Sequence, residues 1–183
     1  MIGAQTKEEA EQILKEIKTR LKKFNLEISA EKTKIVEFGR YAKNNANNRG
    51  KKKPDTFDFL GFTHYVSVSR KGNFLMKVRT NKERRSESLK HINEWLKRIR
   101  NRQKAKDIWK VLSAKLRGHY NYYGVSGNSR ELQNYYHQTI KLTYKWMNRR
   151  SQKQSFNWTT FTEYLKLYPL PKPILVHNMY DIW

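Results

Sequence analysis

The sequence predicts an α+β fold, in which a small β-hairpin region is followed by a mainly α-helical three-helix bundle. Two stretches of alternating apolar residues lie between residues 57 and 80, and the Lys71-Gly72 pair separates them as a hairpin turn would. After Thr80, three successive segments repeat apolar residues at helical spacing. Hydrophobic residues make up 37% of the 183 residues and aromatic residues 13%, which is enough to build a core.

The N-terminal part is predicted to hold one helix and two short strands. The Thr6-Lys-Glu-Glu9 stretch has the spacing of a capping box, and the apolar residues after it predict an amphipathic helix to about Phe24. The stretches LEIS (26–29) and KTKIVEF (32–38) alternate as short strands do, around a Ser-Ala-Glu turn. Residues 40–54 are polar, Asn-rich and basic, and they predict a mobile loop.

Three helices are predicted at about 82–102, 105–123 and 129–149, with short connections that favour an antiparallel bundle. Each has one apolar face when its residues are placed at steps of about 100°. A fourth short helix is expected after Arg150, and an extended, proline-containing tail at 168–183. The predicted core positions are Leu89, Ile92, Trp95, Leu96, Ile99, Ile108, Trp109, Leu112, Leu116, His119, Tyr120, Tyr123, Leu132, Tyr135, Tyr136, Ile140, Leu142, Trp146 and Met147.

The second of these helices allows two roles for the aromatic motif KLRGHYNYYG (115–124). Its rings could stack nucleobases, or they could form the inner face of the helix. Tyr120 and Tyr123 fall on the apolar side and are interpreted as core residues, whereas Tyr122 falls on neither side. Four polar residues share the opposite side, within about 60° of arc. These four are Lys106, Lys110, Arg117 and Asn121.

Net charge is the strongest functional signal. The chain holds 39 Lys and Arg against 16 Asp and Glu, a formal net charge of +23, of which residues 1–38 contribute +1 and the remaining 145 residues +22. Such a charge favours a polyanionic partner, first of all nucleic acid. No apolar run approaches the roughly 18 residues that a membrane span needs, so no membrane partner is expected. There are no cysteines, and we expect a cytoplasmic protein.

Residues for catalysis or metal binding do not group in any pattern that indicates a site. Asp55 and Asp58 flank Phe57 near a strand start, and we interpret them as turn and edge residues. The five histidines lack metal-ligand spacing, and no glycine-rich phosphate loop, serine elbow or catalytic cysteine occurs. The sequence therefore predicts no catalytic residue, metal ligand or cofactor in this chain.

Basic side chains recur in several elements and are the candidates for phosphate contacts. They lie in the 40–54 loop, around the start of the first bundle helix, and on the outer faces of the bundle. Contacts of this kind give affinity and salt dependence but little sequence specificity. The candidate nucleic-acid-binding residues are Lys51, Lys52, Lys53, Arg79, Lys82, Arg84, Arg85, Lys97, Arg98, Lys106, Lys110, Arg117, Asn121, Lys141 and Lys145.

Four motifs extend, in order, over nearly the whole chain: RLKKFNLEISAEKTKIVEFGR (20–40), FDFLGF (57–62), KLRGHYNYYG (115–124) and YPLPKP (168–173). In their order and spacing they resemble bacterial group II intron-encoded reverse transcriptases. The FLGF and RGxxNYYG elements are the most specific of them.

The resemblance implies the end of a reverse-transcriptase palm at 1–80, a helical thumb, or maturase-specific domain, at 81–167, and the tail at 168–183. In this family the FLGF element lies beside the primer end, and Lys32 falls where the family has a lysine that faces nucleic acid. The expected partners are structured intron RNA, an RNA/DNA template–primer duplex, and the fingers and palm of the polymerase. The residues that would position a primer are Phe59, Leu60, Gly61 and Phe62.

One departure from the family pattern concerns catalysis. The family's catalytic aspartates, including a YADD strand, precede the helix that opens this sequence, and MIGAQTKEEAEQIL resembles the family's sequence immediately downstream of that strand. The resemblance therefore implies that Mg²⁺ and polymerase chemistry belong to the complete polymerase. The leading hypothesis is the maturase and thumb portion, which binds intron RNA and the template–primer duplex to assist splicing and reverse transcription.

Two alternatives remain open. The chain could be a subunit that completes a reverse transcriptase whose upstream half is a separate polypeptide. In that case the FLGF element takes part in the polymerase site, and the apolar faces of the partial palm form the interface with the other subunit. The chain could also be a basic DNA-binding helical module. The second alternative ranks lower because the basic residues spread over several helices and do not concentrate on one recognition helix.

Overall fold

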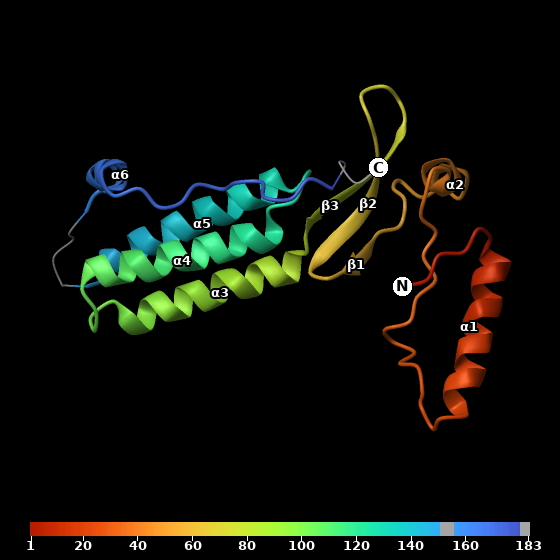
Figure 1. The fold of residues 1–183 in the computed structure, drawn as a ribbon. Helices are drawn as coiled ribbons and strands as arrows, with labels where there is room; N and C mark the ends of the chain where they lie inside the picture. The colour runs from red at the N-terminus through yellow and green to blue at the C-terminus, as the bar shows by residue number, and fades with distance from the viewer. Residues whose placement is uncertain (151–155, 180–183) are drawn as a thin grey trace. The chain divides into compact units, whose positions relative to one another are not determined.

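The computed structural model describes residues 1–150 and 156–179 of the chain. Within these residues it contains six helices and one antiparallel sheet with the strand order β1-β2-β3, so the predicted α+β class is confirmed (Figure 1). The elements are α1 (Lys7–Lys22), α2 (Ala42–Asn48), β1 (Phe57–Phe59), β2 (Phe62–Val68), β3 (Phe74–Thr80), α3 (Lys82–Ile99), α4 (Ala105–Tyr123), α5 (Ser129–Met147) and α6 (Trp158–Leu167).

The chain divides into two compact units. The first comprises Met1–Phe57 and Tyr65–Met76, and the second comprises Asp58–His64 and Lys77–Trp183. No helix in the described part of the chain is long and apolar enough to cross a bilayer.

Helix α1 of the first unit begins as predicted. The Thr6 side chain accepts a hydrogen bond from the Glu9 N–H at 3.1 Å, which satisfies one of the free amides of the first turn. The helix ends at Lys22, two residues before the predicted end. None of its sixteen residues is buried, so its apolar stripe is left partly exposed.

The prediction of two short strands at 26–29 and 32–38 is wrong. A turn does form where it was expected, because the Ser29 carbonyl accepts from the N–H groups of Lys32 and Thr33. The flanking residues pair with no strand in the described residues, and isolated strands are unstable in water. Phe38 anchors the end of the segment, since its ring packs edge-on against Phe57 with 4.9 Å between centroids.

The segment predicted to be a mobile loop contains helix α2. Ala42 and Ala46 lie one turn apart, and both are buried. Glu37 accepts a hydrogen bond from the Asn45 side chain and forms an ion pair with Arg49 at 2.6 Å. These contacts outweigh the modest helix propensity of the asparagines, which the sequence prediction had followed.

The hairpin between β2 and β3 turns where the sequence predicts. The Ser69 N–H donates to the Asn73 carbonyl at 2.8 Å, and the Gly72 N–H donates back to Ser69 at 3.0 Å. Gly72 has φ +81°, a conformation that glycine adopts at little cost.

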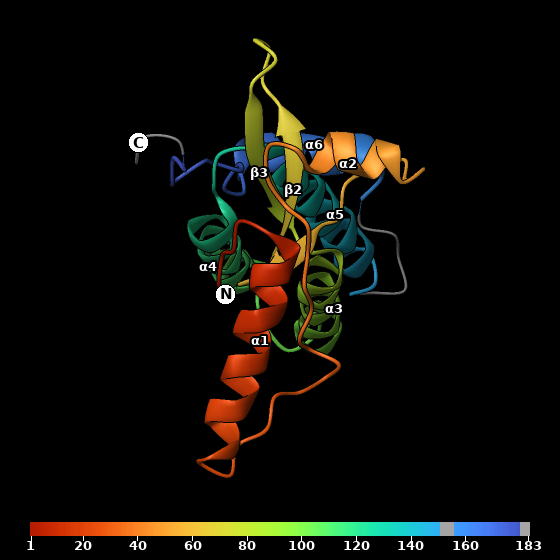
Figure 2. The ribbon, with the colours of Figure 1, turned by 90° about the vertical axis from the view of Figure 1, so that its right-hand side faces the viewer.

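Helices α3, α4 and α5 form the predicted bundle in the second unit, with α3 and α4 both packed against α5 (Figure 2). Each helix lies within three residues of its predicted bounds. The predicted core is confirmed, because every predicted position is buried or partly buried, and all of them except the buried His119 belong to one hydrophobic cluster. Thr139 and Thr143 of α5 are buried as well, and the Thr143 hydroxyl donates to the Thr139 carbonyl.

The chain after α6 is extended and runs back along α4 and α5 (Figure 1). The indole of Trp109 donates to the Tyr168 carbonyl at 2.9 Å, and the hydroxyl of Tyr120 donates to the Pro171 carbonyl at 3.1 Å. Beyond α4, the carbonyl of Gly124 accepts from the N–H groups of Val176 and His177. A side chain at position 124 would collide with backbone oxygens, so the close approach of the tail requires glycine. Residues 180–183 of the predicted tail lie outside the described residues.

Asn128 joins three elements of the second unit. It is fully buried, and its Oδ1 accepts from the backbone N–H of Thr80 at 2.8 Å. Its Nδ2 donates to the hydroxyl of Thr80 and to the carbonyl of Tyr123, both at 2.8 Å. One amide therefore connects the end of β3, the end of α4 and the start of α5.

Substituting Asn128 by alanine should lower the free energy of unfolding by about 3 kcal/mol, because three hydrogen bonds would be lost and the buried N–H of Thr80 would be left without its partner. Urea denaturation measures the change. The control is Asn134→Ala on the exposed surface of α5, which should alter stability by less than about 0.5 kcal/mol. A similar small effect at both positions would contradict the assignment of Asn128 as the junction.

His119 of α4 lies within the bundle, where its ring stacks on Tyr135 with 3.5 Å between centroids. Burial lowers the pKa of His119 from 6.5 to about 4, because the charged imidazolium is poorly solvated there. Between these two values the unfolded chain binds more protons than the folded chain. The free energy of unfolding therefore falls as the pH drops from about 6.5 toward 4.

His119→Phe should remove up to about 3 kcal/mol of this loss of stability while keeping an aromatic ring on Tyr135. Urea midpoints measured between neutral pH and pH 4 provide the test. His137→Phe, at an exposed position of α5, should keep the acid sensitivity of the original chain. If His119→Phe loses as much stability at low pH as the original chain does, another group is responsible for the acid sensitivity.

Candidate nucleic-acid interface

The outer face of α4 carries a row of polar side chains. Lys106, Lys110, Arg117 and Asn121 are all exposed, and they follow one side of the helix over about 22 Å. The opposite side of α4 is buried in the bundle core, so these residues cannot turn inward. The helix packing therefore fixes the direction in which the row faces.

Small residues lie between the charges of this row. Ala114 and Gly118 are exposed, and space is open where Gly118 would carry a Cβ. The only carboxylate of α4 is Asp107, in its first turn. A polyanion could approach the helix backbone closely here, with cations on both sides.

Cations on the other bundle helices are exposed as well. Lys97 and Arg98 lie in the last turn of α3, where the negative end of the helix dipole favours positive charge. Lys141 and Lys145 lie on α5, and the ammonium of Lys145 is 5.2 Å from the centroid of the Trp146 ring. Each of these residues is accessible to an anionic partner.

The predicted cluster at the start of α3 divides into structural and accessible residues. Arg85 is half-buried and forms an ion pair with Glu131, which ties α3 to α5. Arg84 is exposed and pairs with Glu87 at 3.2 Å, one turn along the same helix. Arg79 and Lys82 are exposed, so both are accessible to solvent at the end of β3 and the first turn of α3.

The candidate lysines of the first unit are exposed. Lys51 forms an ion pair with Asp55 at 3.0 Å, whereas Lys52 and Lys53 extend from the connection that follows α2. Lys32 is exposed at the turn after Ser29.

The FLGF element forms the tight turn between β1 and β2. Leu60 and Gly61 are its two central residues, with φ +48° and +78°, the combination found in type I′ hairpin turns. Leu60 is 66% exposed and Phe59 is 42% exposed, so the turn presents apolar side chains to solvent. A left-handed conformation is costly for leucine, which indicates that surrounding contacts hold the turn.

The end of α4 supplies those contacts. The Tyr122 hydroxyl donates to the Leu60 carbonyl at 2.9 Å, and its ring stacks on Phe62 with 6.0 Å between centroids. The ring of Tyr123 lies against Gly61 so closely that a Cβ there would be 3.0 Å from its hydroxyl oxygen. The FLGF and NYYG motifs are therefore one structural unit.

The tyrosines of α4 thus have roles that the sequence indicated only in part. Tyr120 is buried, and Tyr123 is partly buried beneath the turn, as the helical periodicity predicted. Sequence reasoning missed the role of Tyr122 in holding the FLGF turn. Its position on neither the apolar nor the polar face of α4 was a signal of such a separate role. The role of Asn128 as a junction was missed too, because its partner Thr80 lies 48 positions away in the sequence.

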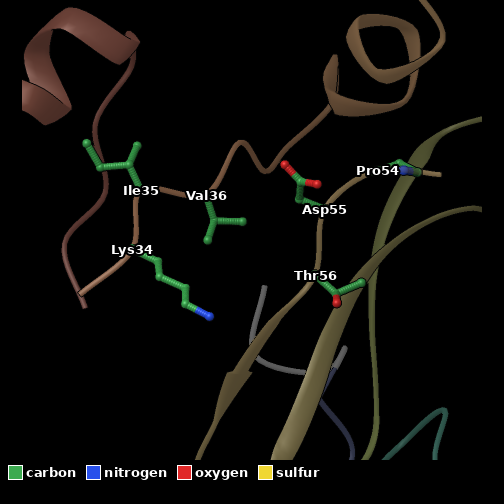
Figure 3. Close-up of a pocket in the computed structure, with 6 residues that line it drawn as sticks. All are labelled: Lys34, Ile35, Val36, Pro54, Asp55 and Thr56. Atoms are coloured by element: carbon green, nitrogen blue, oxygen red, sulfur yellow. The ribbon is translucent and has the colours of Figure 1, made fainter. Parts of the chain in front are cut away.

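A shallow hollow of about 590 Å³ lies in the first unit. Figure 3 shows that its walls come from the segment before Phe38 and from the segment that leads into β1. Its charged residues are Lys34 and Asp55, and Asp55 is paired with Lys51. The hollow offers no grouping of side chains for catalysis.

The described residues do not fit the pair of Mg²⁺ ions that a polymerase uses. Within the described ranges, no three His, Asp or Glu side chains lie close enough to hold a metal ion. Asp55 is bound by Lys51, and Asp58 accepts a hydrogen bond from the Thr63 hydroxyl. We therefore assign these carboxylates to local structure and derive no metal-dependent step.

Comparison with known proteins supports a relationship to reverse transcriptases. Residues 1–64 match the family model described as reverse transcriptase (RNA-dependent DNA polymerase). The matched stretch ends within β2 and includes the FLGF turn, whereas the bundle lies outside it. No curated protein and no solved structure matches the chain.

Leu60→Asn should stabilise the second unit by about 1 kcal/mol, because asparagine tolerates positive φ and Asn-Gly is the preferred pair of a type I′ turn. Urea denaturation measures the gain. Leu167→Asn, at a leucine that is also largely exposed but ends the regular helix α6, should give no gain. Destabilisation by Leu60→Asn would mean that the leucine side chain has a packing role.

Proposed function

We propose that this chain binds structured RNA as the thumb and maturase portion of a group II intron-type reverse transcriptase. The observation that carries the proposal is the row Lys106, Lys110, Arg117 and Asn121, which is exposed on a helix whose other side is fixed in the core. A net charge of +23 adds a long-range attraction to any polyanion. The reverse-transcriptase match over residues 1–64 favours nucleic acid over other polyanions.

In this proposal the FLGF turn positions a primer end. The exposed side chains of Phe59 and Leu60 would contact the nucleic acid, and Tyr122 and Tyr123 would hold the turn in place. The bundle cations would contact the intron RNA and the template–primer duplex, which would assist splicing and reverse transcription. The described residues would contribute binding and positioning, and Mg²⁺-dependent bond formation would belong to a complete polymerase.

The mode of binding depends on the chemistry of the side chains involved. Lysine and arginine contact phosphates, and each contact releases counterions from the nucleic acid. Affinity should therefore fall steeply with salt. Selection of a particular RNA would come mainly from the spacing of its phosphates, since the row holds no aromatic ring and only Arg117 has a planar group that can stack on a base.

Reversing Lys106, Lys110 and Arg117 together to glutamate should lower the affinity for a structured intron RNA about tenfold or more and reduce the salt slope by about three. Binding titrations at several salt concentrations measure both quantities. Thermal melting of the variant should match that of the original chain, because all three residues are exposed.

The matched control reverses Lys15, Lys18 and Lys22 of α1, which are also exposed and change the net charge by the same amount. If both triple variants lose affinity equally, the binding depends on total charge and not on the α4 row. If the original chain prefers a length-matched DNA duplex to the RNA, the chain is a DNA-binding module.

A further inference from the structure

A second group of cations lies at one end of the bundle. Residues 95–106 contain six Lys or Arg and no carboxylate, and residues 132–162 contain five Lys or Arg and no carboxylate. The end of α3, the start of α4 and the end of α5 lie at the same end of the bundle (Figure 1). We call five of these cations the bundle-end cluster: Arg100, Arg102, Lys104, Arg149 and Arg150.

Direct contacts join the two segments of the cluster. The Arg150 guanidinium donates to the Gln103 carbonyl at 3.0 Å, which connects the end of α5 to the α3–α4 loop. The guanidinium carbons of Arg100 and Arg149 lie 4.9 Å and 5.4 Å from the centroid of the Trp146 ring. Two arginines from separate helices are therefore held around one side chain.

The fold explains part of this grouping. Cations near the ends of α3 and α5 interact favourably with the helix dipoles, and the Trp146 ring attracts cations by its quadrupole. Trp146 itself is 5% exposed, and its indole N–H donates to the Asn93 side chain at 2.8 Å. The ring is a core residue that supports the arginines, and it is not open to a stacking base.

Hydrogen-bonding capacity remains after these contacts. The Nε of Arg100 and one terminal nitrogen of Arg150 are buried and have no hydrogen-bond partner. In the described ranges, none of the five cluster residues forms an ion pair with a carboxylate. These two nitrogens are closed to solvent, so an anion would be bound by the exposed charged groups of the cluster. Several like charges held together are unfavourable in isolation, and a bound anion would relieve this cost.

The geometry indicates what kind of anion fits. Guanidinium groups bind phosphate oxygens through forked hydrogen bonds, and cations on three connected segments suit several successive phosphates better than one. Single-stranded nucleic acid is usually bound by exposed aromatic rings on which its bases stack. The Trp146 ring beside the cluster is buried and cannot act in this way. Base-paired RNA is recognised chiefly through phosphates, ribose hydroxyls and shape.

We propose that the bundle-end cluster binds backbone phosphates of base-paired RNA. This inference rests on the proposed function and adds a second contact to the α4 row. Lys104 is the N-cap residue of α4, and Lys106 begins the α4 row two residues later, so the two surfaces meet at the start of this helix. One RNA helix could contact both.

The test variant is Arg102→Gln, Lys104→Gln and Arg149→Gln combined, because these three residues are exposed and, within the described residues, their side chains donate no hydrogen bond to the backbone of another element. The probes are a fully paired RNA hairpin, an unpaired polyuridine RNA of equal length and an acidic peptide, each titrated at several salt concentrations. We expect affinity for the hairpin to fall about tenfold and the salt slope to decrease by about two to three. The matched control, Lys15, Lys18 and Lys22 of α1 changed to glutamine, should retain most of the affinity.

The outcomes separate this inference from the proposed function. If the cluster variant binds the hairpin as tightly as the original chain does, whereas the α4 reversal binds it more weakly, the bundle-end site is wrong. The proposed function is then unaffected. Failure of the original chain to bind any RNA overturns both. Tighter binding of polyuridine or of the acidic peptide than of the hairpin overturns the assignment to base-paired RNA. Should the triple variant melt early, Arg149→Gln alone gives the same test with a smaller expected change.

Discussion

The buried amide of Asn128 is the constraint on which the second unit depends. Three hydrogen bonds fix the end of β3 and the end of α4 relative to the start of α5. Their partners include the buried backbone N–H of Thr80, which would be left unpaired without Asn128, so the junction has few alternatives of comparable energy. Tyr123, whose carbonyl is one of these partners, also lies under the FLGF turn. The position of that turn therefore depends on the packing of the bundle.

Much of the bundle could be predicted from the sequence because its information is local. An apolar residue every three or four positions specifies both the helix and its buried face, and this was sufficient for α3, α4 and α5. The same periodicity also predicts the positions of the exposed cations. It does not predict their grouping, since that depends on which helix ends meet in space.

Several features that sequence reasoning missed depend on distant partners. Asn128 was ordinary in its local context, and its bonds to Thr80 join residues 48 positions apart. Arg85 was assigned to nucleic acid because nothing local indicated its pairing with Glu131. Conversely, the alternation in residues 26–38 predicted strands that no neighbouring strand in the described residues completes. Local patterns therefore predict helices better than they predict strand pairing or long-range polar contacts.

The division of α4 into two faces limits how the proposed binding could be selective. The aromatic rings that could read unpaired bases are used in the core or beneath the FLGF turn, and Tyr122 is bound to Leu60. The remaining outer face offers cations and an amide, which contact phosphate and ribose more readily than base edges. Recognition would then depend on the fixed distances between cations, which the buried faces of the same helices determine. In such a protein, a substitution in the core could change RNA selectivity without altering any residue that contacts RNA.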